Sequence, residues 1–90
     1  MFSLKYSHRF KKDLKRYKNN QLVLKELEIV LDTLIKGKEL PIKNRNHRLV
    51  GEFKDCFECH IKPDVLLVYK KEKLEIIILL LRIGPHSDIF

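Results

Sequence analysis

The spacing of apolar residues is helix-like in the first half of the chain and strand-like in the second. Residues 2–7 alternate apolar and polar side chains, which predicts a short first strand. Ser7 can then cap a helix over residues 8–18, and a second helix should end near Lys36, where Gly37 can stop it. The apolar stripes of these two helices, which should form an antiparallel pair, are Phe10, Leu14, Tyr17, Leu24, Leu27, Leu31, Leu34 and Ile35.

Residues 38–48, KELPIKNRNHR, show no apolar period and are expected to form a loop. Lys54 and Asp55 are a candidate turn in the second half, where the strand-like segments are 49–53, 56–62, 65–71 and 74–84. Connections this short imply antiparallel pairing. The last segment is apolar at nearly every position, so it should lie inside the sheet with both faces covered. The pattern predicts an α+β fold with two N-terminal helices packed on a mainly antiparallel sheet, and a chain of 90 residues suits a single domain over residues 1–90.

Positive charge is concentrated in the first half of the chain. The sequence has 19 Lys and Arg against 12 Asp and Glu, a net charge of +7. Residues 1–48 hold thirteen basic and five acidic residues, which is +8, while residues 49–90 hold six and seven, which is −1. This asymmetry favours a polyanionic partner, with nucleic acid ahead of an acidic protein or an anionic membrane. The cations that we expect to contact RNA are Lys11, Lys12, Lys15, Arg16, Lys43, Arg45 and Arg48.

The sequence indicates a soluble, cytoplasmic protein. Its longest apolar run, at 76–81, is far shorter than the roughly 20 residues that a membrane-spanning helix needs, and the pattern of a secretory signal is lacking. Insertion of the basic helix into a membrane surface is disfavoured because the core needs its apolar stripe. The two cysteines should remain reduced thiols in this compartment.

Residues 56–62, CFECHIK, decide whether the polar residues form a metal site. In a strand, residues three apart point to opposite faces, so Cys56 and Cys59 cannot clasp one zinc ion or act as a redox pair. By the same alternation Phe57, Cys59 and Ile61 should face the core, whereas Glu58 and His60 should face outward together with Cys56. We therefore expect neither a metal nor a cofactor.

His47, Asp64, Arg82 and His86 can join Glu58 and His60 as candidates for catalysis. Each alone has an ordinary structural explanation, such as an exposed ring or an ion pair. Together they suit the attack of an RNA 2′-hydroxyl on the adjacent phosphate, which needs a base, an acid and a cation. Imidazoles can fill either proton-transfer role near neutral pH. Arg82 could offer a forked pair of donors to the phosphate.

Two blocks, HRLVGEFKDCFECHIKPDVLLVY at 47–69 and LRIGPHSDIF at 81–90, resemble the YafQ branch of the RelE superfamily. These are toxins of bacterial type II toxin–antitoxin systems that cleave mRNA. The family pattern is a His, a Leu and a Gly, then Arg-Glu-Cys-His-Ile, Pro-Asp, an apolar strand, and Arg-Thr-Gly-Thr-His-Ser before a terminal Leu-Phe. The blocks match in order and spacing over about a third of the chain, and within the branch the chain is similar to small toxins from Helicobacter.

The resemblance implies a RelE-like fold and an endoribonuclease that acts on mRNA in the ribosomal A site. It also implies a cognate antitoxin, which we expect to be acidic and to cover the basic surface. Carried over by position, the acid–base set is His47, His60, Asp64 and His86, with Arg82 for the phosphate, Glu58 to orient His60, and Phe90 to stack on a base.

The chain departs from the family pattern at four positions. Phe57 stands where the family often has Arg, Ile83 and Pro85 replace two threonines, and Val65 replaces a larger side chain. These departures leave open an altered or weaker nuclease. They also leave open a second hypothesis, a non-catalytic RNA-binding or ribosome-binding module on the same fold.

Overall fold

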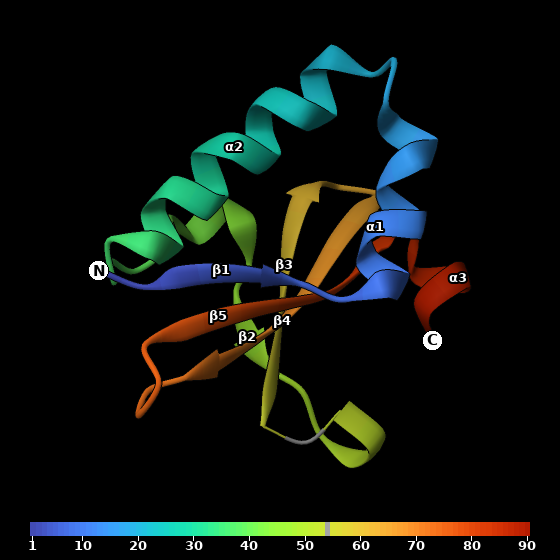
Figure 1. The fold of residues 1–90 in the computed structure, drawn as a ribbon. Coiled ribbons are helices and arrows are strands. Elements are labelled where there is room, and N and C mark those ends of the chain that lie inside the picture. The colour runs from blue at the N-terminus through green and yellow to red at the C-terminus, as the bar shows by residue number, and fades with distance from the viewer. Residues whose placement is uncertain (54) are drawn as a thin grey trace.

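The computed structural model describes residues 1–53 and 55–90, except for the side chain of Glu52. Figure 1 shows the order of the elements along the chain. They are β1 (Ser3–Tyr6), α1 (His8–Leu14), the 3-10 helix η1 (Lys15–Tyr17), α2 (Gln21–Ile35), the 3-10 helix η2 (Ile42–Asn44), β2 (His47–Arg48), the 3-10 helix η3 (Gly51–Phe53), β3 (Cys56–Lys62), β4 (Val65–Glu72), β5 (Ile77–Gly84) and α3 (His86–Ile89).

Within these described ranges the strands form one five-stranded sheet in the order β1-β5-β4-β3-β2. The pairs β2–β3, β3–β4 and β4–β5 are antiparallel, and β1 lies parallel to β5. The mainly antiparallel sheet is as predicted. β5 lies inside the sheet between β1 and β4, which agrees with its nearly continuous apolar sequence.

The two long helical segments begin and end where the sequence predicts. The Ser7 hydroxyl accepts a hydrogen bond from the Phe10 N–H at 3.0 Å, and the side chain of Asn20 caps α2 in the same way. Gly37 follows α2 with φ = 71°, a conformation that glycine adopts without strain. Its N–H donates to Leu34 O and that of Lys38 to Thr33 O, the paired bonds of a Schellman motif.

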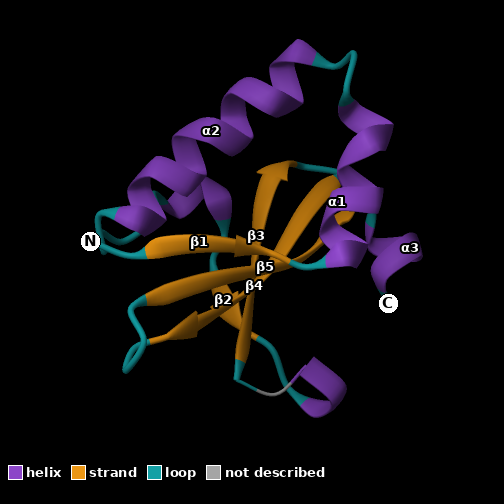
Figure 2. Ribbon diagram, viewed as in Figure 1, coloured by secondary structure: helices purple, strands orange, loops and turns teal. Residues whose placement is uncertain are grey.

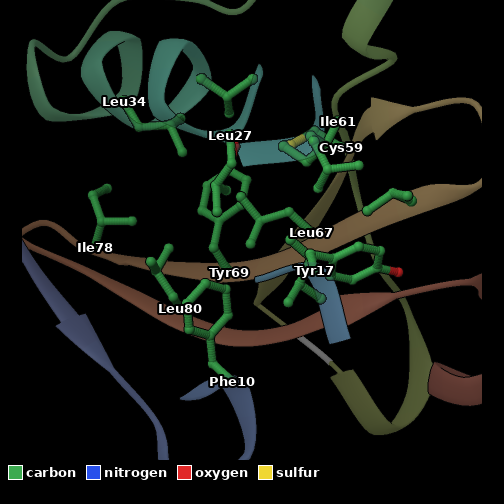
Figure 3. Close-up of a cluster of buried hydrophobic side chains, with 14 residues drawn as sticks. Phe10, Tyr17, Leu27, Leu34, Cys59, Ile61, Leu67, Tyr69, Ile78 and Leu80 are labelled. Atoms are coloured by element: carbon green, nitrogen blue, oxygen red, sulfur yellow. The ribbon is translucent and has the colours of Figure 1, made fainter. Parts of the chain in front are cut away.

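Both helices cover one face of the sheet, and Figures 1 and 2 show them diverging as a V. The predicted antiparallel pair is therefore wrong in detail: α1 packs on β5 and α2 packs on β3. Figure 3 shows the large core that fills the space beneath them. Its most buried side chains include Phe10, Cys59, Leu67, Ile78, Leu80 and Ile83.

The opposite face of the sheet holds a second, smaller apolar cluster, formed by Cys56, Leu66, Val68 and Ile89. Ile89 belongs to α3, and Phe53 of η3 packs against the edge of the cluster. The face that we expected to point outward is thus partly covered. An alternating strand pattern cannot show this, because a short helix from a distant part of the chain supplies the cover.

Two strand boundaries also differ from prediction. The segment 49–53 is not a strand: β2 ends at Arg48, and Gly51 turns the chain into η3 with φ = 77°. Lys54 of the predicted turn lies outside the described residues. β5 begins at Ile77 rather than at residue 74, because Leu74 is fully exposed and Ile76 has φ = 58° in the turn before the strand.

Candidate functional site

A histidine and a glutamate form the central pair of the site. His47 of β2 lies directly opposite Glu58 of β3, so the two side chains share one face of the sheet. Nε2 of His47 is 3.5 Å from Oε1 of Glu58. His60 follows two positions along β3, and its Nε2 is 3.8 Å from the same oxygen. One carboxylate oxygen therefore lies between two imidazole rings.

These three side chains differ strongly in exposure. The Glu58 side chain is 9% exposed, that of His60 is 19% exposed and that of His47 is 52% exposed. Glu58 is paired across the sheet with Val68 of the second apolar cluster, which excludes water from its side. The arrangement places a buried hydrogen-bond acceptor behind two rings that a ligand can reach.

The loop before β2 contacts the ring of His47 and the backbone of His60, and it brings positive charge beside them. Nδ1 of His47 is 2.8 Å from Arg45 O; because a carbonyl only accepts, Nδ1 carries the proton and Nε2 faces Glu58. The Asn44 amide donates to His60 O at 2.8 Å. Lys43 and Arg45 line a cavity of about 310 Å³ with His60. A phosphate beside His60 would thus meet cations from this loop.

The C-terminal helix α3 carries the third imidazole. Ile89 is buried in the second apolar cluster and anchors α3 to the face of the sheet that holds Glu58. His86 and Phe90 lie side by side with ring centroids 5.1 Å apart, and Phe53 meets Phe90 edge-on at 5.4 Å. Phe90 is 47% exposed, so its ring remains accessible. No ring contact or ion pair in the described structure joins His86 to Glu58.

Arg82 binds a carboxylate of the protein. Its Nε donates to Oδ2 of Asp13 at 2.7 Å, and its Nη2 donates to Oδ1 at 3.2 Å. The N–H of Ile83 also donates to Asp13, at 3.1 Å. The side chains of Arg82 and Asp13 are only 15% and 12% exposed. The forked donor pair that the sequence offered to a phosphate is thus used to hold α1 against the end of β5.

Asp13 is a residue that the sequence interpretation missed. Burial acts to raise its pKa and is the largest single influence, but the hydrogen bonds from Arg82 and Ile83 and the charge of Arg82 together outweigh it. The pKa of Asp13 is therefore below its ordinary value. One signal was available, since Asp13 is the only acidic residue in the strongly basic segment 8–18.

Asp64 lies apart from the histidine pair. It is exposed in the turn between β3 and β4 and lines a cavity of about 340 Å³ with Arg16, Tyr17 and Pro85. Within the described residues no ion pair connects Asp64 to His60 or His86. The structure places Asp64 at the same end of the sheet as α3 but does not join it to either ring.

The basic residues fall into two groups. Lys11, Lys12 and Lys15 are exposed on α1 and η1, whereas Arg16 forms an ion pair with Asp88 and so ties η1 to α3. The other group is at the opposite end of the site, where Lys43 is 3.9 Å from Glu26 and Arg48 is 3.8 Å from Asp55. Surface pairs of this length are weak and exchange readily for another anion.

The cysteines follow the predicted alternation. Cys59 is buried in the large core and Cys56 in the second cluster, on opposite faces of β3, and both are free thiols. Burial, with a smaller contribution from the charge of Glu58, raises the pKa of Cys59 to about 12. In the part of the chain that the structure describes, no group of three or more His, Cys, Asp and Glu side chains is arranged to hold a metal ion.

Phe57 shows how the chain accommodates one departure from the family pattern. It faces the helix side as predicted, where it stacks on Tyr69 with ring centroids 5.6 Å apart. The guanidinium of Arg48, its partner across β2 and β3, lies 5.0 Å from the centre of the Phe57 ring. The neighbouring strand β2 thus places a cation, Arg48, beside Phe57. Val65 and Ile83, which also depart from the family pattern, are buried in the core.

Comparison with known proteins shows the same fold in bacterial toxins. A metal-bound toxin from Helicobacter pylori has a crystal structure that matches with a TM-score of 0.91 and 42% identity, covering 100% of both chains. The crystal structure of YafQ from Escherichia coli strain BL21(DE3) matches with a TM-score of 0.87 and 25% identity, over 100% of this chain and 99% of that one. The E. coli DinJ–YafQ complex gives a TM-score of 0.87, 26% identity and the same coverage.

The sequence comparisons lead to the same group. The mRNA interferase toxin YafQ of E. coli strain K12 is 29% identical over 89 residues, 97% of this chain and 94% of that protein. Fold and sequence together define a bacterial toxin of the type II toxin–antitoxin class. The family described as "Bacterial toxin of type II toxin-antitoxin system, YafQ" matches residues 2–90, and the chain belongs to this YafQ family. The predicted family and RelE-like α+β fold are thereby confirmed.

Proposed function

We propose that this toxin is an endoribonuclease that cuts mRNA on the ribosome by metal-independent acid–base catalysis. The observation that carries the proposal is the Glu58 oxygen that lies 3.5 Å from His47 and 3.8 Å from His60. A buried carboxylate behind an accessible imidazole is the arrangement that orients a general base or acid. The name mRNA interferase, which the E. coli relative carries, supports RNA as the substrate.

The reaction needs two proton transfers around one phosphorus atom. The ribose 2′-oxygen attacks the adjacent phosphorus, while a base removes its proton. The bond between phosphorus and the 5′-oxygen then breaks, and an acid delivers a proton to that oxygen. The products are a 2′,3′-cyclic phosphate and a 5′-hydroxyl, so no water and no cofactor are consumed. Two imidazoles of opposite protonation state satisfy both steps, because each ring can accept or donate a proton near neutral pH.

His60 and His86 are the rings that we assign to these two transfers. His60 borders the cavity that contains Lys43 and Arg45, where a phosphate can bind. Its ring lies 3.8 Å from Glu58, and its carbonyl accepts a hydrogen bond from Asn44. His86 stands beside the exposed ring of Phe90, which can stack on a base of the substrate. His47, whose Nδ1 donates to Arg45 O and whose Nε2 lies 3.5 Å from Glu58, is assigned a role that assists His60 through Glu58. Asp64 is assigned an orienting role in the substrate complex.

Two sets of residues supply the positive charge that stabilises the phosphorane-like transition state. Lys43 and Arg45 lie beside His60 and meet the phosphate directly. Arg82 is assigned a second contribution. Because Asp13 occupies its Nε and Nη2, Arg82 reaches a phosphate either through Nη1 or by exchanging Asp13 for the substrate.

An acidic antitoxin is the protein partner that we assign to the basic surface. The DinJ–YafQ complex shows that a relative assembles with a second protein. The exposed lysines of α1 and η1 suit a partner with negative charge, and covering α3 would block His86 and Phe90 together. No helix within the described ranges combines the length and apolar character that a membrane span requires.

Cleavage of a defined mRNA by the wild-type protein and three variants tests the proposal. The variants are His86→Ala, Glu58→Gln and His8→Ala, and each reaction is run with and without ribosomes and with and without a chelator. His8 is the matched control, because it is the remaining histidine of the chain and lies exposed on α1. We expect His86→Ala and Glu58→Gln to slow cleavage by about 100-fold or more. His8→Ala should cut at the wild-type rate.

The chemistry of the fragment ends separates the possible outcomes. Ends with a 2′,3′-cyclic phosphate, formed equally in the presence of the chelator, support the 2′-hydroxyl mechanism. Loss of cleavage in the chelator would contradict metal independence. If the wild-type protein binds ribosomes or RNA but never cuts, the competing hypothesis of a non-catalytic binding module replaces this one. In that case neutralising Lys11, Lys12, Lys15 and Arg16 should abolish the biological effect, and His86→Ala should not.

A further inference from the structure

Besides the cavity beside His60, a second cavity borders the loop that leads into β2. It has a volume of about 460 Å³ and is bounded by the end of α2, by the loop after α2, and by β4. Apolar side chains form part of its wall: Leu34, Leu40, Pro41 and Tyr69. A cavity of this size is in the range of small-molecule and single-nucleotide sites.

The rim of this cavity is positively charged. Lys38, Arg45 and Lys71 line it, against one carboxylate, Glu39. Within the described part of the chain none of the three cations pairs with a carboxylate, in contrast to Lys43, which is 3.9 Å from Glu26. Cations without a carboxylate partner attract an anionic ligand, because binding does not have to break an existing ion pair.

Hydrogen-bond donors are also available inside the cavity. The hydroxyl of Tyr69 donates to Oδ1 of Asn46 at 2.7 Å, so it is directed by a protein group. This bond uses the amide oxygen of Asn46 and leaves its two N–H donors for a ligand. Apolar walls, an amide and a cationic rim are together the features that bind a base and its phosphate in single-stranded nucleic acids.

Arg45 connects this cavity to the candidate catalytic residues. It lines both this cavity and the one beside His60. Its backbone has φ = 50°, a conformation that non-glycine residues adopt rarely, and its carbonyl accepts from Nδ1 of His47 at 2.8 Å. The same residue therefore positions an imidazole and borders both cavities. An RNA strand bound beside His60 can cross Arg45 and enter the second cavity.

We propose that this cavity is a subsite for a nucleotide of single-stranded RNA that flanks the cleaved phosphate. The inference rests on the proposed function, because it takes RNA as the substrate of the neighbouring catalytic residues. It adds a specific place for the substrate outside the bond that is cut. RNA binding should then depend on the length of the strand.

Binding of two uncleavable RNAs tests this subsite. Both are 2′-O-methylated, one holding only the two nucleotides around the cleavage point and the other extended by several nucleotides on each side. Affinity of the full-length protein is measured by fluorescence anisotropy at several salt concentrations. The test variant is the double change Lys38→Ala and Lys71→Ala. Lys25→Ala is the control, since Lys25 is exposed on α2 and lines neither cavity.

The expected result is a weakening specific to the longer RNA. The double variant should bind it about tenfold more weakly, while binding of the short RNA and the effect of Lys25→Ala stay at the wild-type level. The salt dependence for the longer RNA should also fall, by about 0.7 in log–log slope for each phosphate that the variant no longer neutralises. Thermal unfolding of the double variant is measured alongside, because Lys71 also lies 5.3 Å from the centre of the Phe2 ring.

Three outcomes distinguish a failure of the subsite from a failure of the proposed nuclease function. If the double variant binds both RNAs like the wild type, or weakens both equally, the subsite is wrong. If RNA binding is unchanged but the affinity for an acidic antitoxin falls, the cavity belongs to a protein partner instead. If the double variant shows the length-specific weakening but the wild-type protein cuts no unmodified mRNA even with ribosomes, the subsite stands and the proposed nuclease function fails.

Discussion

The two faces of the sheet serve different purposes, although they share the same strands. The face under α1 and α2 carries the large core, with side chains such as Leu67 and Leu80 that are fully buried. The other face has a small apolar cluster and, at its border, Glu58 and His60. On β3 the two kinds of residue alternate, so that Cys59 supports the fold and His60 lines a cavity one position later.

This arrangement separates the demands of stability from those of chemistry. The large core includes 14 buried side chains of the described residues, against four in the second cluster, so it contributes most of the hydrophobic free energy of folding. The small cluster has only four buried side chains; it lies beside the buried Glu58 and anchors α3 through Ile89. Substitutions on the helix-side face should therefore mainly lower the free energy of unfolding. Substitutions on the other face should mainly lower the rate of mRNA cleavage.

The largest effect on stability should come from the helix-side face. Leu67→Ala removes a side chain that is 0% exposed and leaves a cavity between β4 and the helices. We expect the free energy of unfolding to fall by about 3 kcal/mol. Urea unfolding followed by circular dichroism measures this change, with Leu74→Ala as the control because Leu74 is 100% exposed. The activity of the protein that remains folded should be unchanged; a large fall would show that the faces are not separable.

The next largest effect should come from the ion pair between α1 and the end of β5. Asp13→Asn leaves Arg82 without its charged partner, which should lower the free energy of unfolding by about 2 kcal/mol near neutral pH. Because the pKa of Asp13 is lowered in the folded state, its contribution is complete above the ordinary aspartate value near 4. It is lost as pH falls through the lowered value.

Unfolding measured across this pH range checks the sign. The difference between wild type and Asp13→Asn should shrink as pH falls below about 4 and disappear at still lower pH. Asp32→Asn is the control: Asp32 pairs with Lys36 on the surface with 61% of its side chain exposed, so the change should be small at every pH. If the difference in the free energy of unfolding instead grew as pH fell, the stabilisation would not come from the ionised carboxylate of Asp13.

The sequence predicts the fold much better than it predicts the neighbours of each polar residue. Helix limits, strand alternation and the inner position of β5 depend on local patterns, and these are visible in the chain. The pairing of His47 with Glu58 depends on the β2–β3 register, and β2 is too short to show an alternation of its own. The binding of Arg82 by Asp13 joins residues 69 positions apart.

The second cluster was beyond prediction for a related reason. α3 has four residues, too few for an apolar stripe, yet Ile89 covers strands whose other face is already buried. The family pattern did point to His86 and Phe90, which lie together as ring neighbours. It could not show that their helix is held by Ile89 beneath and by the Arg16–Asp88 pair beside it.

The smallest effect on stability should come with a disproportionate effect on activity. Ile89→Ala removes the apolar anchor of α3, and because α3 is short and terminal we expect the free energy of unfolding to fall by only about 1 kcal/mol. His86 and Phe90 depend on α3 for their position, so mRNA cleavage should fall by about tenfold under conditions where the protein is fully folded. Cleavage rate and urea unfolding are measured on the same preparation. Ile29→Ala is the control, since Ile29 is 49% exposed on α2 and lines neither the cavity beside His60 nor the proposed subsite. If cleavage by Ile89→Ala fell only in proportion to the unfolded fraction, the small cluster would be a second structural core and not the support of the catalytic face.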